Sequence, residues 1–341
     1  MATLQMKAIC PPQHIFQILH GRWAVQVLQS AVELDVFSKM AAGAQDATAV
    51  AKALDADTHA TEVLLNALCS LGFLLKKDGR YQLNELSQNY LVKSSPLYIG
   101  GFVAHDHVAE FWKNLPETIR TGKPASAVNQ QAHAEDFFPK LAAGIFPLSY
   151  STAHDVVSQL KLNELPAGSR ALDIAAGSGV WSIPLAQQNK NVHVDALDFP
   201  AVLKVTREFA EREGVDAQYS YIEGGWRNCK IESDKYDVIF LGHILHSEGM
   251  EESAALLKEC YRALRPNGKI VIAEMIGYDD YSGPPSAQLF AVNMLIMTQH
   301  GCIFSVKELS DMLTNEGFKN PTRLKLQNWR DDDAPIMVAT K

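Results

Sequence analysis

A loop with two glycines links a short apolar run to a helical one, in the segment Asp173-Ile-Ala-Ala-Gly177-Ser-Gly179. Gly177 and Gly179 let the backbone bend sharply and approach a ligand, and the amides at the start of the next helix can receive a carboxylate. A tight turn between a strand and a helix would give the same pattern without a ligand. We therefore consider the loop together with the strand ends that follow it.

An acidic residue ends the next apolar run, VHVDALD, 25 residues after Asp173. This residue, Asp198, precedes Phe199 and can accept hydrogen bonds from both hydroxyls of a ribose, the role of an acid at this position in dinucleotide-binding folds. Asp195 is a second candidate, but it lies within the strand pattern, whereas Asp198 lies at the carboxyl end, where ligands collect. The loop and the acid predict a ligand that contains a ribose.

Two further strand ends carry candidate side chains. One strand leads into Gly224-Gly225-Trp226, and the next ends at Gly242, four residues before His246. Trp226 can cover an aromatic base, and His246 can face a second ligand. A single histidine is more often structural, but one beyond a strand end is well placed for acid–base chemistry.

These residues lie in a segment, 166–341, where short β-rich runs alternate with helical ones. The alternation predicts an α/β, Rossmann-like fold, a mostly parallel sheet wrapped by helices. The last two runs have no room for a helix between them and should form an antiparallel hairpin at the end of the sheet. The β-rich runs are RALDIAA, VHVDALD, QYSYIEG, YDVIFLG, GKIVIAE, TRLKLQ and IMVATK.

Residues 1–101 show the pattern of a winged helix, three helices followed by a hairpin. We expect helices over 14–40, from a cap at Asp46 to residue 54, and from Asp57 or Thr58 to residue 71. The segment FLLKKDGRYQL then supplies two short strands around Asp78-Gly79, a strong hairpin signal.

The charge of this region argues against DNA binding. The candidate recognition segment, HATEVLLNALCSLGF, contains no Lys or Arg and one Glu. The net charge of the whole chain is −8, so no general field attracts nucleic acid or anionic lipid. We expect the apolar surface of these helices to meet a second copy of the chain as a homodimer.

Residues 102–165 are predicted to form a mostly helical connector that is rich in aromatic residues. A connector between two domains is a favoured place for an apolar pocket. Phe146 and Tyr150 are therefore candidates to contact a substrate, with core packing as the alternative interpretation.

The composition excludes several other classes of protein. The five cysteines lie far apart without a CxxC pair, so we expect neither a disulfide framework nor a metal site. The N-terminus lacks a secretory signal pattern, and charged residues or glycines interrupt the apolar stretches before they could cross a bilayer. We expect a cytoplasmic protein, without a membrane partner, that acts on a small molecule.

The run from Tyr236 to Glu274, YDVIFLGHILHSEGMEESAALLKECYRALRPNGKIVIAE, resembles the family of plant caffeic acid and animal acetylserotonin O-methyltransferases. The resemblance extends over the whole chain, with AVELDVFSKM and YQLNELSQNYLVKSSP matching that family's dimerisation domain. It implies a class I methyltransferase fold, S-adenosylmethionine as methyl donor with S-adenosylhomocysteine as product, and methylation of a small, aromatic or polyketide-like acceptor.

The resemblance also implies roles for single residues. His246 matches the catalytic general base, and Glu274 matches an acid that flanks it. Met294 and Thr298 stand where the family lines its acceptor pocket, with Met297 beside them. The predicted cofactor-binding residues are Asp173, Ala175 (at the first glycine of the family's loop), Gly177, Gly179, Asp198, Phe199, Gly225, Trp226 and Gly242.

The sequence departs from the family pattern at three further positions. Trp226 replaces an acid that contacts adenine, Ser247 replaces an Asp after the base, and Ile303 stands where a second base-flanking Glu is expected. These departures leave open methylation of carbon, or hydroxylase-like or pericyclase-like chemistry without methyl transfer. A winged-helix DNA-binding regulator is the remote alternative.

Overall fold

The computed structural model describes residues 12–104, 108–124, 131–326, 329 and 333–341, with the backbone alone at residues 110, 131–137 and 140. Two compact units make up the chain, Met1–Asp106 and His107–Lys341. Among the described residues, every helix is too short or too polar to span a membrane.

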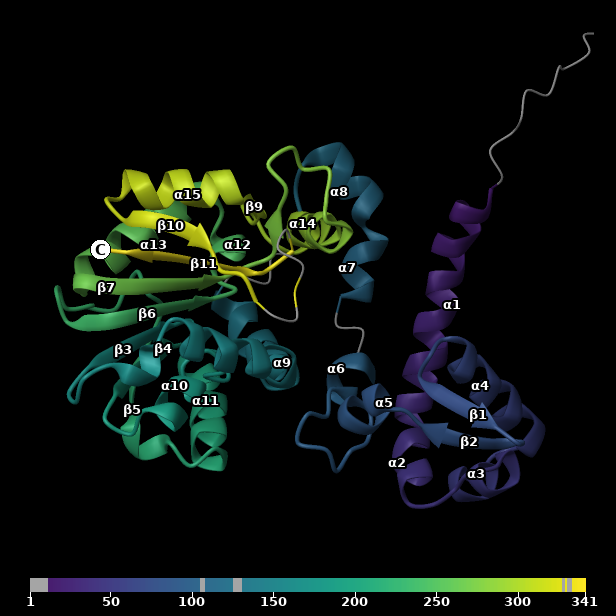
Figure 1. Cartoon of the computed structure of the whole chain (residues 1–341). Helices are drawn as coiled ribbons and strands as arrows, with labels where there is room; N and C mark the ends of the chain where they lie inside the picture. The colour runs from purple at the N-terminus through teal and green to yellow at the C-terminus, as the bar shows by residue number, and fades with distance from the viewer. Residues whose placement is uncertain (1–11, 105–107, 125–130, 327–328, 330–332) are drawn as a thin grey trace, which may run out of the picture. The chain divides into compact units, whose positions relative to one another are not determined.

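The first unit is mainly helical and carries one hairpin (Figure 1). The helix expected over 14–40 is in fact two helices, because Asp35 has a φ of 61° and turns the chain into the left-handed region between them. Its elements are α1 (Gln13–Glu33), α2 (Val36–Ala41), α3 (Ala47–Leu54), α4 (Thr58–Ser70), β1 (Leu74–Lys77), β2 (Arg80–Leu83), α5 (Glu85–Tyr90) and α6 (Gly100–Ala104).

The expected caps and hairpin are confirmed. Asp46 and Asp57 accept hydrogen bonds from the third backbone N–H after each of them, at 2.8 Å, and so begin α3 and α4. Asp78 and Gly79 have φ values of 49° and 74°, the left-handed pair that a two-residue hairpin turn requires.

One face of α1 is apolar and exposed. Only Ala31 and Val32, near its end, are buried in the unit's core. The exposed apolar side chains of its first half are Ile15, Phe16, Ile18, Leu19 and Trp23. A run of this kind is typical of a surface that meets another protein.

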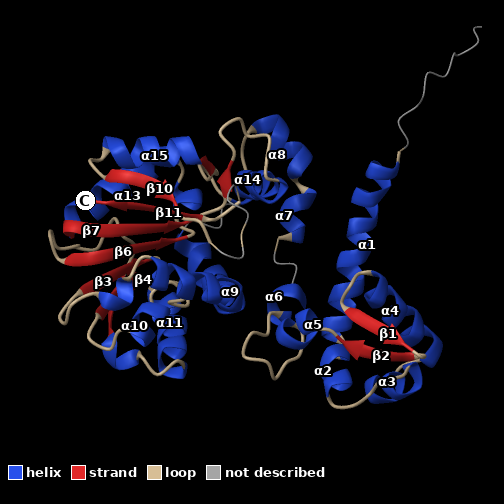
Figure 2. Ribbon diagram, viewed as in Figure 1, coloured by secondary structure: helices blue, strands red, loops and turns tan. Residues whose placement is uncertain are grey.

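The second unit contains the sheet and the remaining helices (Figures 1 and 2). Before the sheet come α7 (Ala109–Lys113), α8 (Leu115–Thr121), α9 (Gln131–Gln159) and η1 (Leu162–Glu164). The sheet region contains β3 (Arg170–Ile174), α10 (Ile183–Gln188), β4 (His193–Asp198), α11 (Pro200–Arg212), η2 (Asp216–Gln218), β5 (Tyr219–Glu223), β6 (Tyr236–Gly242), α12 (Leu245–Glu248), α13 (Met250–Ala263), β7 (Leu264–Ala273), β8 (Ile276–Gly277), α14 (Pro285–Met297), β9 (Phe304–Ser305), α15 (Val306–Asn315), β10 (Lys319–Arg323) and β11 (Ile336–Thr340).

The seven-stranded sheet has the order β10-β11-β7-β6-β3-β4-β5. Strands β3 to β7 run parallel, and β10 and β11 form the expected antiparallel hairpin at one end, with β10 over 319–323 rather than 322–327. The predicted mostly parallel α/β fold is therefore confirmed. β4 and β6 lie on opposite sides of β3, so the crevice for a ligand is expected at the carboxyl ends of these strands.

Helices cover both faces of this sheet (Figure 2). Successive side chains of β3 point to opposite faces, Ala171 into the cluster with α9, α10 and α11, and Leu172 into the cluster with α13 and α15. Burial on both faces explains why the strands are continuous apolar runs. It also holds their carboxyl ends in fixed register.

Candidate active site

The loop after β3 bends through three left-handed residues. Ala175, Gly177 and Gly179 have φ values of 55°, 59° and 73°. For Ala175 this conformation carries a strain of roughly 1–2 kcal/mol, which a glycine would not have. The Gly177 carbonyl accepts a hydrogen bond from Thr206 Oγ1 of α11 at 2.7 Å, so the bend is fixed from outside the loop.

Asp198, at the end of β4, faces this loop. Its Oδ2 accepts the Gly177 backbone N–H at 2.9 Å, and its Oδ1 accepts the Phe199 N–H at 2.7 Å. The side chain is 9 % exposed, and burial raises the pKa of Asp198 to about 6. A carboxylate has about four acceptor sites, so these two bonds leave capacity for further donors.

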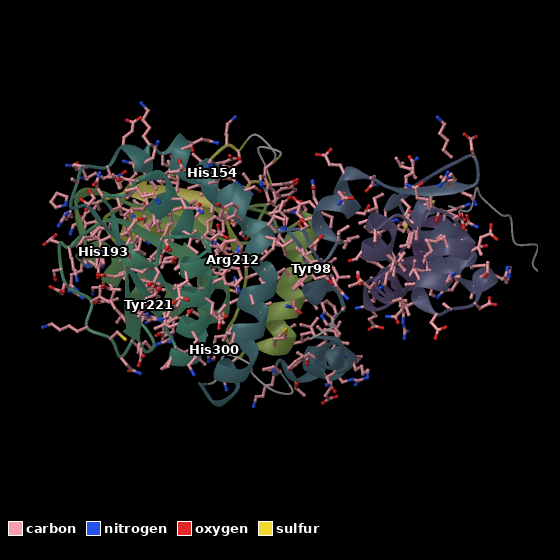
Figure 3. All side chains as sticks on the ribbon, turned by 90° about the horizontal axis from the view of Figure 1, so that it is seen from below. Tyr98, His154, His193, Arg212, Tyr221 and His300 are labelled. Atoms are coloured by element: carbon pink, nitrogen blue, oxygen red, sulfur yellow. The ribbon has the colours of Figure 1, made fainter. Side chains whose placement is uncertain are left out.

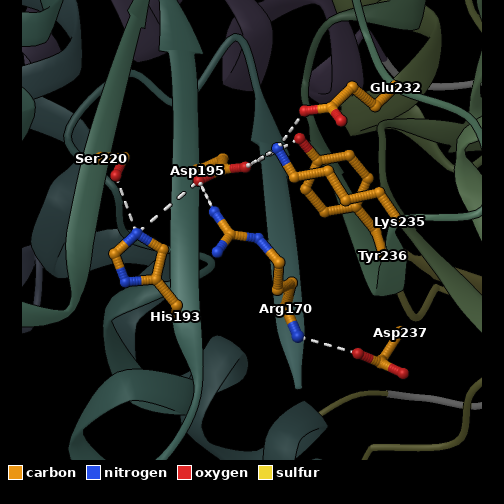
Figure 4. A network of polar contacts seen from close by, with 8 residues as sticks. All are labelled: Arg170, His193, Asp195, Ser220, Glu232, Lys235, Tyr236 and Asp237. Carbon is orange, nitrogen blue, oxygen red and sulfur yellow. Dashed lines mark hydrogen bonds and ion pairs between the residues drawn. The ribbon is translucent and has the colours of Figure 1, made fainter. Parts of the chain in front are cut away.

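Asp195, the alternative acid, lies within β4 and is paired with residues from the amino ends of β3 and β6 (Figure 4). It accepts hydrogen bonds from Arg170 at 2.5 Å and from the Tyr236 hydroxyl at 2.8 Å, and Lys235 lies 3.2 Å away. These partners hold it in a structural network, which leaves Asp198 as the acid at the carboxyl edge.

Asp173 is fully buried at the base of the loop. Its Oδ2 accepts the Ser182 hydroxyl at 2.5 Å, and no described residue hydrogen-bonds its Oδ1. Burial raises the pKa of Asp173 to about 7. The buried Oγ of Ser178 likewise has no hydrogen-bond partner among the described residues. Two buried polar atoms without protein hydrogen-bond partners at one loop favour the binding of a ligand that supplies those partners.

The loop after β5 lies beside the Asp198 region. The Gly224 N–H donates to the Asp198 carbonyl at 2.9 Å, and a Cβ on Gly225 would lie 3.7 Å from the Phe199 ring. The indole Nε1 of Trp226 is buried without a hydrogen-bond partner among the described residues. The structure thus brings Asp198, Phe199 and Gly225 together, and Trp226 follows Gly225 in the chain.

His246 and Glu274 form a hydrogen-bonded pair beyond the ends of β6 and β7. His246 Nδ1 lies 2.6 Å from Glu274 Oε2, and the His246 backbone N–H donates to Oε1 at 3.2 Å. Burial alone raises the pKa of Glu274, but the charge and hydrogen bonds of His246 outweigh it, so this pKa lies below its usual value. Glu274 therefore stays a carboxylate, and no described residue bonds His246 Nε2.

Three aromatic side chains that lie beside His246 or beside its chain neighbours Gly242 and His243 were not predicted from the sequence. Phe290 of α14 packs edge-on against His246, with ring centroids 4.8 Å apart. Trp181 lies against Gly242, where an added Cβ would come within 2.2 Å of its ring. His243, next along the chain, lies 6.0 Å from both Trp181 and His246 between ring centroids. The first histidine of GHILH, His243, was the signal in the sequence that could have indicated this cluster.

The predicted pocket residues of α14 have distinct surroundings. Met294 is buried one turn after Phe290, on the same helix face. Met297 packs with Ile296 against α7 and α8. Thr298 Oγ1 donates to the Met294 carbonyl at 2.7 Å and accepts the Gly301 N–H at 2.8 Å.

Phe146 and Tyr150 of α9 contact α10 and α11. Phe146 lies 4.4 Å from Phe209 between ring centroids, and Arg212, labelled in Figure 3, lies over both rings. The Tyr150 hydroxyl donates to Gln187 at 2.6 Å. These contacts account for the packing of both side chains, and their contact with an acceptor stays a prediction.

His243, His246 and Glu274 also offer atoms that metals bind, all within 4.8 Å of one another. However, His246 Nδ1 and both oxygens of Glu274 already take part in the hydrogen bonds described above. A metal ion would have to replace these bonds. The geometry favours an acid–base pair.

Comparisons with known proteins show the family to which the chain belongs. Residues 106–319 match the family model described as an O-methyltransferase domain, and residues 16–93 match the O-methyltransferase dimerisation domain. The chain belongs to the O-methyltransferase family. The dimerisation match lies in the first unit, and the O-methyltransferase domain match covers the loop, Asp198, His246 and Glu274 in the second.

Individual relatives of this O-methyltransferase are distant but nearly full-length. The chain is 29% identical over 312 residues to a 3-hydroxy-5-methyl-1-naphthoate 3-O-methyltransferase of Streptomyces sahachiroi, covering 90% of this chain and 89% of that protein. It is 24% identical to an L-tyrosine C(3)-methyltransferase of Streptomyces lavendulae, covering 95% and 91%. The structure of human N-acetylserotonin methyltransferase in complex with SAM shares the fold, with a TM-score of 0.81, 22% identity, and coverage of 100% and 99%.

Proposed function

We propose that this O-methyltransferase moves a methyl group from S-adenosylmethionine to the hydroxyl of a small aromatic metabolite, with His246 as general base. The observation that carries the proposal is the 2.6 Å contact between His246 Nδ1 and Glu274 Oε2. The contact fixes the imidazole beside the strand ends where the donor-binding loop also lies.

The residues at the carboxyl edge fit S-adenosylmethionine. The unpaired atoms of Asp173 and Ser178 suit the ammonium and carboxylate groups of its methionine part. Asp198 has acceptor capacity left for ribose hydroxyls. Phe199, Gly225 and Trp226, whose Nε1 has no hydrogen-bond partner among the described residues, suit the adenine, and the absence of a side chain on Gly242 lets Trp181 pack against the end of β6.

When bound, S-adenosylmethionine supplies a methyl group that its positive sulfur has already activated. The chain then has to hold the acceptor oxygen in line and remove its proton. With Nδ1–H donated to Glu274, the Nε2 lone pair of His246 takes the hydroxyl proton while the oxygen–carbon bond forms and the sulfur–carbon bond breaks. Glu274 stabilises the imidazolium, and such catalysis contributes on the order of 10² to 10⁴ in rate.

The surroundings of His246 favour a flat, apolar acceptor. Phe290 of α14 packs against the base, Met294 lies one turn further along this helix, and Met297 and Thr298 stand at its end. A relative named for a hydroxynaphthoate substrate supports an aromatic ring as the acceptor. Phe146 and Tyr150 of α9 are the other candidate residues for contact with the acceptor.

The first unit suits a homodimer. It matches a dimerisation domain and carries the exposed apolar side chains on α1. The occupant we propose for this face is a second copy of the chain.

The test is methyl transfer by the purified chain to a panel of naphthols and phenols with S-adenosylmethionine. We expect a product heavier by one methylene, with the methyl group on oxygen by NMR. A methyl group on carbon would support the alternative suggested by the tyrosine C-methylating relative. Failure to bind S-adenosylhomocysteine in calorimetry would refute the proposal.

A further inference from the structure

His243 is a second imidazole beside the proposed base, and its backbone is unusual. It follows Gly242 at the end of β6 and has a φ of 60°. Few residues other than glycine adopt this region, although histidine does so more often than most. Its backbone N–H donates to the Ala273 carbonyl at 2.9 Å, which holds the conformation. Backbone of this kind is concentrated at functional sites.

The ring of His243 lies between the donor-binding side and the base. Its centroid is 6.0 Å from that of Trp181, which packs on Gly242, and 6.0 Å from that of His246. One nitrogen of His243 lies within 4.8 Å of a nitrogen of His246 and of an oxygen of Glu274. The two ring nitrogens do not hydrogen-bond each other, but a ligand placed between them can bond both.

The chemistry of His243 suits an uncharged ligand group. Among the residues that the structure describes, none hydrogen-bonds its ring. Burial lowers the pKa of His243 to about 4, so the ring is neutral at neutral pH and offers one donor and one acceptor. A largely enclosed imidazole without partners is less stable than one that has them.

A cation is a poorer occupant than an oxygen atom. The two Glu274 oxygens and His246 Nδ1 already take part in hydrogen bonds, so a cation would be left with His246 Nε2 and the ring of His243 as free ligands among the described residues. A hydroxyl or carbonyl oxygen needs only one hydrogen-bond partner, which His243 can supply.

We propose that His243 is a second acceptor-binding residue, which hydrogen-bonds an oxygen substituent next to the hydroxyl that His246 deprotonates. The preferred acceptors are then aromatic compounds with two neighbouring oxygens, in ortho or peri positions. The inference rests on the proposed function, because it takes His246 as the base.

The test compares 2,3-dihydroxynaphthalene with 2-naphthol, titrated into the full-length chain saturated with S-adenosylhomocysteine. One hydrogen bond between neutral groups predicts about 3- to 10-fold tighter binding of the diol. In His243→Gly the two affinities should become equal. His243→Asn is the matched control, because Asn tolerates the same backbone region and keeps a donor and an acceptor, so it should retain part of the preference.

Several results would overturn the inference. These are equal binding of the two probes by the wild type, no binding of either, an unchanged ratio in His243→Gly, or diol binding that a chelator removes and Zn²⁺ restores. Calorimetry with S-adenosylhomocysteine distinguishes failure of the proposed function from failure of the role of His243. If S-adenosylhomocysteine binds and a naphthol is methylated, but His243→Gly leaves the ratio of the diol and naphthol affinities unchanged, only the role of His243 is refuted.

Discussion

The side chains of His246 and Glu274 meet through His246 Nδ1 and Glu274 Oε2, 2.6 Å apart, although the residues lie 28 positions apart in the chain. The Glu274 side chain has no solvent exposure, and it also accepts a hydrogen bond from the His246 backbone N–H. The bond orients the ring and fixes its tautomer, so that Nε2 is the nitrogen available to a substrate.

Removing the imidazole should abolish most of the turnover. We expect His246→Ala to lower kcat by about 10² to 10⁴. Affinity for S-adenosylhomocysteine should stay within about twofold, because His246 touches no residue proposed to bind it. Steady-state kinetics and calorimetry measure the two effects, and a variant with wild-type kcat would reject His246 as the base.

Removing only the charge of Glu274 is a finer test. Glu274→Gln keeps the size of the side chain but replaces a charge-assisted hydrogen bond. We expect kcat to fall about 10- to 100-fold, the value of a bond to a charged group, with little change in the KM for the donor. A loss confined to KM would point instead to a role in binding.

Affinity for S-adenosylhomocysteine should depend on the ionisation of Asp198. Burial raises its pKa to about 6 in the free chain, so below that pH the carboxylate is protonated and can accept fewer hydrogen bonds from ribose. Protonation of Asp198 should by itself weaken affinity about tenfold for each pH unit below 6. Asp198→Asn should bind weakly at every pH, whereas Asp195→Asn, further back in β4, should bind as the wild type does.

Much of the fold follows from local patterns in the sequence. The caps at Asp46 and Asp57 and the turn at Asp78-Gly79 depend on neighbouring residues alone, and all three are confirmed. The break at Asp35 was missed because the apolar spacing continues through it. The left-handed φ of Asp35 accompanies the packing of α1 against α2, and the spacing of apolar residues carries no information about that packing.

The site was predictable to the extent that strand ends define it. Asp198 and Gly177, predicted from their place after β4 and β3, are joined by a hydrogen bond. The neighbours of His246 were not predictable in this way. Phe290 lies on α14, and its contact with His246 depends on the tertiary packing of that helix, which has no distinct apolar face.

The apolar side chains on α1 should hold the proposed dimer together. We expect Trp23→Glu to convert a dimer into a monomer, since a buried unpaired charge is costly. Gln17→Glu, on the same exposed helix, is the control and should remain dimeric. Sedimentation velocity measures both, and a dimer that persists in Trp23→Glu would assign the interface elsewhere.

The buried acids should also make the free chain less stable as the pH rises. Burial raises the pKa of Asp173 to about 7, whereas an unfolded Asp titrates near about 3.9. Between about pH 4 and pH 7 the folded state thus keeps a proton that the unfolded state has released, so the contribution of Asp173 to the free energy of unfolding falls with rising pH. Asn at this position cannot ionise and can still accept the Ser182 hydroxyl. Asp173→Asn should therefore increase the free energy of unfolding at pH 8 by on the order of a few kcal/mol, and so raise Tm, and it should give little gain at pH 4. Calorimetry without ligand measures the difference, and an equal change in Tm at both pH values would mean that Asp173 is not protonated in the folded chain.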